Sequence, residues 1–499
     1  MQLKGITLKP SKSKSRQLPI ARGGKSVPAV LLTALIALFC SAIATTAAVA
    51  KDPPLSLHPD NPHYFLWRGQ PTVLITSAEH YGAVLNLDFD YSTYLQELEA
   101  RKLNNTRVFS GAYVEPAGAF NIAKNTLAPS AGRFIAPWAR SDQPGYANGG
   151  NKFDLTRWDE SYFQRLRDFV QQAAQRGVVV EMNLFCPFYD EVQWQLSPQN
   201  ASNNVNGIGT VDRQMVYTLD QNGGLLAIHD AMTRKIVTEL NEFDNLYFEI
   251  CNEPYFGGVT IPWQHHIAEV IADTERTLPN QHLISQNIAN GSERIENPHP
   301  AISIFNFHYA SPPTAVAENY ALNKAIGDNE TGFKGTENTH YRMEAWQFIL
   351  AGGALYNNLD YSFVAGHEGG DFKYPAEQPG SGNPEFRQQM TVLRDFINSF
   401  NFVRMKPDSG FIKAGVPEKM RVYALTQAGQ QYAAYFFGEN KPAQQSLSLT
   451  LELPPGEYAI EWVDVFSGKP IKSERVKSPD VKTISSPKFQ REIALSIRR

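Results

Sequence analysis

Two glutamates stand out in this sequence because each ends a stretch that should form a buried strand. Glu253 lies in an Asn-Glu-Pro motif directly after the apolar run Leu246–Ile250, and Glu330 ends a second strand candidate at 324–330. Proline has no N–H group for a sheet ladder, so the first strand stops at the motif and leaves a carboxylate at its exit. Two carboxyl groups in one site can serve as nucleophile and general acid in glycoside hydrolysis.

Strands and helices alternate along the part of the chain that must position these glutamates. The strand candidates are 72–77, 106–109, 178–184, 246–250, 283–287, 302–307, 324–330 and 354–363. The helix candidates are 89–102, 158–176, 225–240, 265–277, 341–351 and 386–400. This order predicts an α/β fold, a (β/α)8 TIM barrel with its chemistry at the carboxyl ends of the strands. Glu253 and Glu330 would end the fourth and seventh strands, where a separation of about 5–5.5 Å fits retaining hydrolysis.

Two long loops interrupt the barrel pattern. The loop Tyr113–Asn151 carries Trp138, and the loop Pro187–Asp220 carries Trp194. Loops of this length inside a domain are usually functional or disordered. Both tryptophans are therefore candidate substrate platforms, with an anchoring role in their loops as the equal alternative.

From Val422 the pattern changes to alternating apolar and polar residues with turn residues between the runs. This is typical of antiparallel strands and predicts a small all-β sandwich domain. The predicted organisation is a signal peptide at 1–50, a catalytic barrel at 51–403 and the sandwich at 404–499. We expect the sandwich to support the barrel rather than to bind carbohydrate.

The first fifty residues have the features of a secretory signal. Seven Lys and Arg residues without an acid precede the apolar stretch Ala29–Ala44, and Ala48-Val49-Ala50 fits a cleavage site. The apolar stretch is short for a membrane span. We expect a bacterial protein exported to the periplasm or the medium, with an uncleaved membrane anchor as the alternative.

The charge and the cysteine content limit the classes of partner and the kinds of site that we expect for this protein. Without the seven basic residues of the leader, 39 Lys and Arg stand against 50 Asp and Glu, which gives a net charge of −11. Such an acidic protein is a poor candidate for binding nucleic acid or an anionic membrane. Beyond the leader only Cys186 and Cys251 remain, and we expect both to be buried free thiols. No metal-ligand spacing or phosphate loop occurs, so neither metal nor cofactor is expected.

The strand ending in Asn-Glu-Pro, together with the later strand Lys-Ala-Ile-Gly-Asp-Asn-Glu, resembles the clan A, cellulase-type retaining glycoside hydrolases. The resemblance implies that Glu253 is the acid/base and Glu330 the nucleophile. It also matches Arg107 to the clan's arginine on the second strand, and His308-Tyr309 more loosely to its site on the sixth. The tail resembles a C-terminal β-domain labelled collagen-binding, a label that we do not take as a function.

Further residues have expected roles at such a site. Asn252 would bond the sugar 2-hydroxyl, Tyr309 would orient Glu330, and His80 and His308 would bond other hydroxyls. Tyr361 stands where many clan members place a tryptophan, which changes the floor of the sugar subsite.

The chemistry requires different protonation states for the two acids. Arg107 would keep the pKa of Glu330 low, whereas an apolar setting and a neighbouring negative charge would raise the pKa of Glu253. The alternative for Arg107 is a pairing with a structural acid, and the alternative for His80 and His308 is an ordinary place in the core. Glu337 and Glu344 are rival nucleophiles, and Glu344 is discounted because it falls in a helix pattern.

The sequence thus predicts an exported, metal-independent, retaining β-glycoside hydrolase acting on a polysaccharide or oligosaccharide. The alternative is a non-catalytic glycan-binding protein on the same barrel, in which one of the glutamates would be displaced from the barrel mouth. An esterase ranks last, because the chain has no G-x-S-x-G elbow. The sugar, the linkage, endo or exo action and the oligomeric state stay open.

Overall fold

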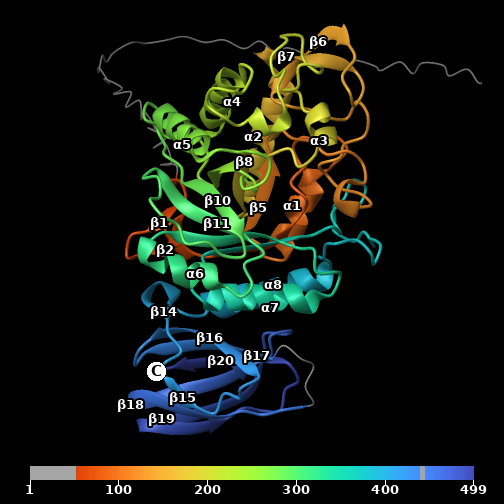
Figure 1. The fold of residues 1–499 in the computed structure, drawn as a ribbon. Coiled ribbons are helices and arrows are strands. Elements are labelled where there is room, and N and C mark those ends of the chain that lie inside the picture. Colours follow the sequence, from red (N-terminus) through yellow and green to blue (C-terminus); the bar gives the residue numbers. More distant parts are fainter. Residues whose placement is uncertain (1–51, 439–443) are drawn as a thin grey trace, which may run out of the picture. The chain divides into compact units, whose positions relative to one another are not determined.

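Parallel strands joined in a near-closed barrel form the first part of the chain that the structure describes. The computed structural model describes residues 52–438 and 444–499, and the predicted signal peptide lies outside them. The barrel strands are β4 (Leu74–Ala78), β5 (Asn105–Phe109), β8 (Val179–Phe185), β9 (Leu246–Cys251), β10 (Ile284–Asn290), β11 (Ile302–His308), β12 (Ala325–Thr331) and β13 (Leu355–Leu359). They pair in the order β4-β13-β12-β11-β10-β9-β8-β5, which confirms the predicted barrel (Figure 1).

The barrel strands are buried on both faces, and several of them carry polar residues as well as apolar ones. Every residue of β5, β8, β9, β12 and β13 is buried, as expected for parallel strands between a packed interior and a layer of helices. The helices are α1 (Tyr91–Ala100), α2 (Glu160–Gln175), α3 (Glu191–Leu196), α4 (Leu225–Leu240), α5 (Ile261–Glu275), α6 (Thr314–Asn319), α7 (Asn338–Leu350) and α8 (Pro384–Asn398). Asp90, Asp159 and Asn383 accept backbone N–H bonds at the starts of α1, α2 and α8 and so fix where these helices begin.

The first and last strands of the barrel order, β4 and β5, meet at a seam that a side chain closes. The Ile75 N–H donates to Asn104 Oδ1 at 2.9 Å, and Asn104 Nδ2 donates to the Val73 carbonyl at 2.9 Å. Asn104 is itself buried just before β5. One amide group therefore replaces part of the backbone ladder between these two strands.

Replacing Asn104 with alanine is expected to destabilise the barrel by about 2–4 kcal/mol. It would leave a buried N–H and a buried C=O without partners, and each such group costs about 1–3 kcal/mol. Urea unfolding followed by tryptophan fluorescence measures the effect. Asn398→Ala, at the exposed end of α8, is the control and should unfold like the unaltered protein. Equal midpoints for the two variants would contradict the role of Asn104 at the seam.

The C-terminal part is antiparallel and all-β, as predicted. Its strands are β14 (Lys406–Pro407), β15 (Ile412–Ala414), β16 (Met420–Gln427), β17 (Gln431–Gly438), β18 (Ser448–Val463), β19 (Pro470–Ser485) and β20 (Glu492–Arg498). They share one hydrogen-bonded path, β14-β16-β17-β20-β18-β15, with β19 paired to β18. The long strand β18 pairs with β15, β19 and β20. The C-terminal strands therefore form one bent sheet around an apolar core of their own, in place of the two separate sheets of the predicted sandwich.

The barrel and the C-terminal sheet share apolar and ionic contacts through α7. The ring of Tyr435 on β17 stacks on Trp346, with ring centroids 5.3 Å apart. Arg342 Nε donates to Glu492 Oε1 at 3.1 Å, and the Tyr435 hydroxyl donates to Glu492 Oε2 at 2.6 Å. All four side chains are buried. This boundary therefore has the character of a protein interior.

The region after β5 differs from the prediction. The loop expected at 113–151 contains most of a hairpin, β6 (Trp138–Pro144) and β7 (Asn151–Trp158), so α2 begins at Glu160 rather than at 158. Before the barrel, β1 (Ser56–His58), β2 (Asn61–Trp67) and β3 (Gln70–Thr72) form a small antiparallel sheet. In the described ranges, none of the helices combines the length and the apolar character that a membrane crossing requires.

Candidate active site

A narrow pocket opens at the carboxyl ends of the barrel strands. Glu253, Glu330, Asn252, His80 and Tyr309 all line it, so half of the ten predicted site residues meet there. Its volume is about 50 Å³, which is room for one or two water molecules at roughly 30 Å³ each. A larger hollow of about 770 Å³ lies at the amino ends of the strands, but none of the described residues that line it is acidic.

Glu253 sits just beyond β9 and is held by three side chains. The Tyr189 hydroxyl donates to its Oε2 at 2.6 Å, while its Oε1 lies 3.1 Å from His308 Nδ1 and 3.3 Å from the Tyr255 hydroxyl. Asn252 Nδ2 donates to the Tyr189 hydroxyl at 2.8 Å. The carboxylate is thus fixed in orientation, with 7% of Glu253 exposed.

Glu330 lies on β12 and accepts bonds on both of its oxygens. The Tyr309 hydroxyl donates to Oε1 at 2.6 Å, and the Tyr81 hydroxyl donates to Oε2 at 3.0 Å. Arg107 Nη1 lies 3.3 Å from the same Oε2. The Tyr309 contact is the orienting role that the sequence predicts for this residue.

The two glutamates face the same space. One oxygen of Glu253, one oxygen of Glu330 and a ring nitrogen of His308 all lie within 4.8 Å of one another. The glycan-binding alternative requires one glutamate to be displaced from the mouth, and the structure has both there. This is also the one group of metal-ligand type found among residues 52–438 and 444–499. A cation would have to compete there with the hydroxyl and guanidinium donors that hold the two carboxylates.

The backbone around the pocket is strained. Ten described residues other than glycine have a positive φ, and half of them line this pocket. These five are Tyr81, Phe120, Glu253, Tyr309 and Phe333. Such conformations cost of order 1–3 kcal/mol each and gather at functional sites. The strain therefore marks the same pocket as the carboxylates do.

Arg107 has both of the roles considered for it. Besides Glu330, it pairs with two buried acids on neighbouring strands, Glu181 on β8 and Glu249 on β9. Burial, together with the charge of Glu249, raises the pKa of Glu181 to about 8. The charge of Arg107 acts against this rise and balances the buried acids around it.

The expected rise in the pKa of Glu253 is not what the structure indicates. Burial does act to raise this pKa, but the hydrogen bonds and charge of His308 and the bond from Tyr189 outweigh it and bring the pKa below its ordinary value. The pKa of His308 is raised by Glu330 and Glu253 although burial opposes the rise. In the free site the shared proton therefore rests on His308.

Replacing His308 with asparagine is expected to move the alkaline limb of the kcat/KM profile to lower pH. Two groups that share one proton bind it more tightly than the remaining group does alone. The sign follows from the raised pKa of His308, because the pair loses its proton only above the ordinary value for histidine. Rates between pH 4 and 10 measure the limb. His367→Asn, which alters an exposed histidine paired with Asp371, is the control, and an unchanged limb in His308→Asn would contradict the shared proton.

The other predicted substrate residues divide into two groups. His80 lines the pocket, and the ring of Tyr361 lies edge-on to it at 5.3 Å, one layer further out. Trp138 and Trp194 do not line the pocket and are buried as loop anchors, which corrects their assignment as platforms. Trp138 begins the β6 hairpin, and Trp194 Nε1 donates to the Val211 carbonyl at 3.0 Å.

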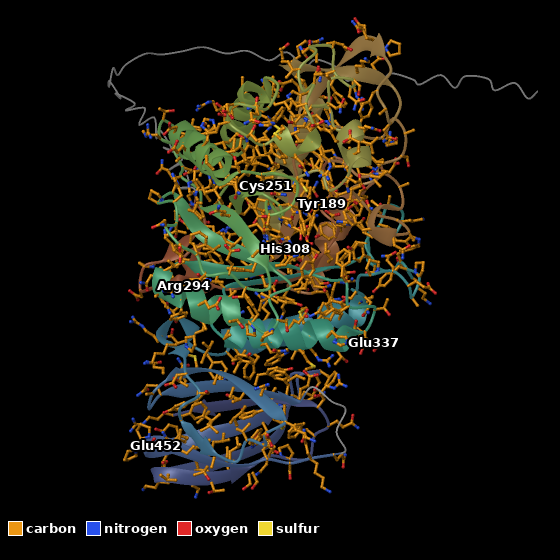
Figure 2. The ribbon with its side chains drawn as sticks, in the orientation of Figure 1. Tyr189, Cys251, Arg294, His308, Glu337 and Glu452 are labelled. Carbon is orange, nitrogen blue, oxygen red and sulfur yellow. The ribbon has the colours of Figure 1, made fainter. Side chains whose placement is uncertain are left out.

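Neither rival nucleophile is at the pocket. Glu337 is exposed at the start of α7, well away from His308 and Tyr189 (Figure 2). Glu344 lies on α7 and pairs with Lys334. Cys186 and Cys251 are buried free thiols, as predicted.

Sequence reasoning missed several pocket residues. Tyr81, Tyr189 and Glu115 line the pocket, and Phe120 and Phe333 add aromatic rings at its edge that are 39% and 45% exposed. Tyr81 belongs to the polar and aromatic cluster after the first barrel strand, and Tyr189 follows the third. Their position shortly after a buried strand is the signal that could have identified these two.

No protein-family model matches this chain, and no curated protein matches it. Solved structures, in contrast, do match this chain. A candidate glycoside hydrolase from Bacteroides vulgatus has a TM-score of 0.62 at 14% identity, over 89% of this chain and 82% of that one. A second structure, described as a glycoside hydrolase, has a TM-score of 0.60 at 14% identity over 89% and 97%. A family 5 glycoside hydrolase from Bacteroides vulgatus has 0.59 at 13% over 89% and 93%. At these identities the likeness shows the fold, which is a glycosidase-type barrel.

Proposed function

We propose that this protein is a retaining β-glycoside hydrolase, with Glu330 as nucleophile and Glu253 as acid/base. The observation that carries the proposal is that one carboxylate oxygen of Glu253 and one of Glu330 lie within 4.8 Å of each other at the ends of β9 and β12. Retaining enzymes hold their two carboxyl groups at about 5–5.5 Å, whereas inverting enzymes need about 6.5–9.5 Å. The glycosidase-type barrel supports the same reading, with a carbohydrate as substrate.

In the first step a Glu330 oxygen bonds to the anomeric carbon as the glycosidic C–O bond breaks. The departing oxygen takes a proton that Glu253 has received from His308, whose Nδ1 is 3.1 Å away, and Glu253 is left ionised. As Glu330 becomes an ester it loses the negative charge that favours the imidazolium, so the proton leaves His308 more readily. Tyr309 and Tyr81 keep the Glu330 carboxylate in line for attack.

In the second step water attacks the anomeric carbon and the ester bond to Glu330 breaks. Glu253 takes a proton from this water, and His308 accepts the proton again as the charge on Glu330 returns. The anomeric configuration is inverted twice and is therefore retained.

The test is the stereochemistry of hydrolysis. A panel of aryl β-glycosides is incubated with the full chain in buffer containing EDTA, and the first product anomer is identified by proton NMR. We expect the β-anomer to form first, without need of a metal. An α-anomer formed first would establish inversion. Activity lost in EDTA and restored by Zn²⁺ would show that Glu253, His308 and Glu330 hold a metal.

Export is also part of the proposal. A basic segment, an apolar stretch and a small-residue cleavage site precede Lys51, and this order supports secretion to the periplasm or the medium. Cell fractionation with N-terminal sequencing of the mature protein tests it. A mature N-terminus near Lys51 is expected, and an intact leader in the membrane fraction would indicate an anchor instead.

A further inference from the structure

A third carboxyl group lines the pocket, and the proposed reaction does not use it. Glu115 lies in the loop after β5 and is 4% exposed. The Tyr113 hydroxyl donates to its Oε1 at 3.1 Å, and Asn125 Nδ2 donates to its Oε2 at 3.1 Å. Both partners are neutral, and each carboxyl oxygen has a second lone pair. Glu115 can therefore take part in further hydrogen bonds at the pocket wall.

The surroundings of Glu115 keep it uncharged. Burial raises its pKa to about 8, and the nearby charges of Glu330 and Asp190 act in the same direction. His80 Nε2 lies 4.0 Å from Glu115 Oε1. Burial and the charge of Arg107 lower the pKa of His80 to about 3, so this ring is neutral too. A protonated carboxyl group beside a neutral imidazole offers donors and acceptors, which is what a pair of sugar hydroxyls requires.

Polar atoms without a protein partner surround the same wall. His80 Nδ1, Asn125 Oδ1 and the Tyr361 hydroxyl are buried and make no hydrogen bond within the described chain. Buried polar atoms without partners are uncommon and call for a specific explanation, such as an unseen ligand or water. Of these three residues only His80 lines the pocket, so its Nδ1 is the atom that a hydroxyl group of a bound molecule would satisfy.

The pocket also lacks a free cation. The described residues that line the pocket include neither lysine nor arginine, but they include the three acids Glu115, Glu253 and Glu330. Arg107 contacts Glu330, but its other guanidinium nitrogens are paired with Glu181 and Glu249. A carboxylate on the substrate would be repelled here and would have no partner.

We propose that Glu115 and His80 form the pocket wall that hydrogen-bonds the hydroxyl groups of the sugar, and that they restrict this subsite to neutral sugars. The inference rests on the proposed glycosidase function. Uronic acids are excluded because their carboxylate would enter a pocket lined by acids. Glu115 and His80 are substrate-binding residues in this scheme and take no part in bond breaking.

The test combines Glu115 variants with deoxy substrates. An aryl glycoside that the protein cleaves is compared with its monodeoxy analogues, for the unaltered protein, Glu115→Leu and Glu115→Gln. Loss of one such hydrogen bond lowers kcat/KM by about tenfold to a hundredfold. We expect that loss in Glu115→Leu on the parent substrate, with far less loss on the analogue lacking the contacted hydroxyl. Glu115→Gln preserves shape and hydrogen bonding and should lose less than about threefold.

A structural role would give a different pattern. It would lower the rates on all substrates equally, with no coupling to one hydroxyl, and that result would overturn the inference. Glu344→Gln is the control, because Glu344 is also a buried acid with a pKa raised by burial but lies on α7 outside the pocket. If Glu115→Leu does not fold, the unaltered protein still tests the wall. Its kcat/KM must fall by about tenfold or more on the analogue that lacks the contacted hydroxyl, and equal rates on the parent and all deoxy analogues would count against the wall.

The exclusion of uronic acids has its own measurement. Matched pairs such as aryl glucoside and glucuronide, or galactoside and galacturonide, are compared by kcat/KM. The neutral member of the cleaved pair is expected to be preferred at least about a hundredfold, as for a buried charge left unpaired. Cleavage of the uronide at an equal rate would overturn the inference and leave the glycosidase function standing. Absence of hydrolysis across both series would overturn the glycosidase function itself.

Discussion

Glu330→Gln is expected to lower kcat on aryl glycosides by about ten-thousandfold or more. The amide cannot form the glycosyl ester, and loss of a nucleophile costs enzymes of this kind most of their rate enhancement. The substitution keeps the size of the side chain, and its carbonyl oxygen can still accept a bond from Tyr309 or Tyr81. The loss should therefore appear in turnover with little change in the unfolding midpoint, and single-turnover assays measure it.

Two comparisons sharpen this result. Glu337→Gln alters the rival acid at the exposed start of α7 and should keep full activity. Glu253→Ala should slow substrates with poor leaving groups most, and added azide should restore turnover by giving a β-glycosyl azide. If Glu330→Gln kept a tenth of the activity while Glu337→Gln lost it, the assignment of the nucleophile would be wrong.

Arg107→Met is expected to destabilise the protein by about 3–5 kcal/mol, because removing one partner of a buried ion pair leaves uncompensated charge. Glu181 and Glu249 would remain buried without their cation. Glu181 can avoid this only by holding a proton, and its pKa in the folded variant must rise further because Arg107 no longer opposes the rise. A raised pKa means that the folded variant binds more protons than its unfolded chain, and stability then falls as pH rises.

The pH dependence separates this effect from a simple loss of packing. The difference in unfolding free energy between Arg107→Met and the unaltered protein should be larger at pH 8 than at pH 5.5, as measured by urea denaturation. Arg276→Met removes an exposed pair with Asp273 and should change stability by less than about 1 kcal/mol at either pH. A difference for Arg107→Met that does not vary with pH would contradict the charge balance described here.

Much of the barrel could be predicted because local sequence determines it. The run Leu246–Ile250 is apolar except for Glu249, and it forms a strand that is buried throughout. Glu253 and Glu330 could be placed at one mouth because the carboxyl ends of parallel strands meet there. The hairpin at Trp138 escaped prediction, because β6 carries polar and exposed residues without clear alternation.

Other site features depend on residues that are distant in sequence. The pKa of Glu253 is lowered by His308, which comes from another strand and lies 55 residues away. Glu115 reaches the pocket because its N–H donates to the Leu127 carbonyl at 2.8 Å, across its own long loop. Neither contact leaves a local pattern in the sequence. Burial alone suggested the wrong direction for the pKa of Glu253, since the direction depends on which partner the fold supplies.

The boundary between α7 and the C-terminal sheet bears on how the molecule melts. Trp346 and Arg342 on the barrel are covered by Tyr435 and Glu492, so neither part can open without exposing a ring and a buried charge of the other. We expect one calorimetric transition, with a van't Hoff enthalpy equal to the measured one. Two resolved transitions would contradict this. A chain cut near Ser409 would accordingly be recovered as aggregate rather than as a working barrel, which makes the sheet a condition of solubility.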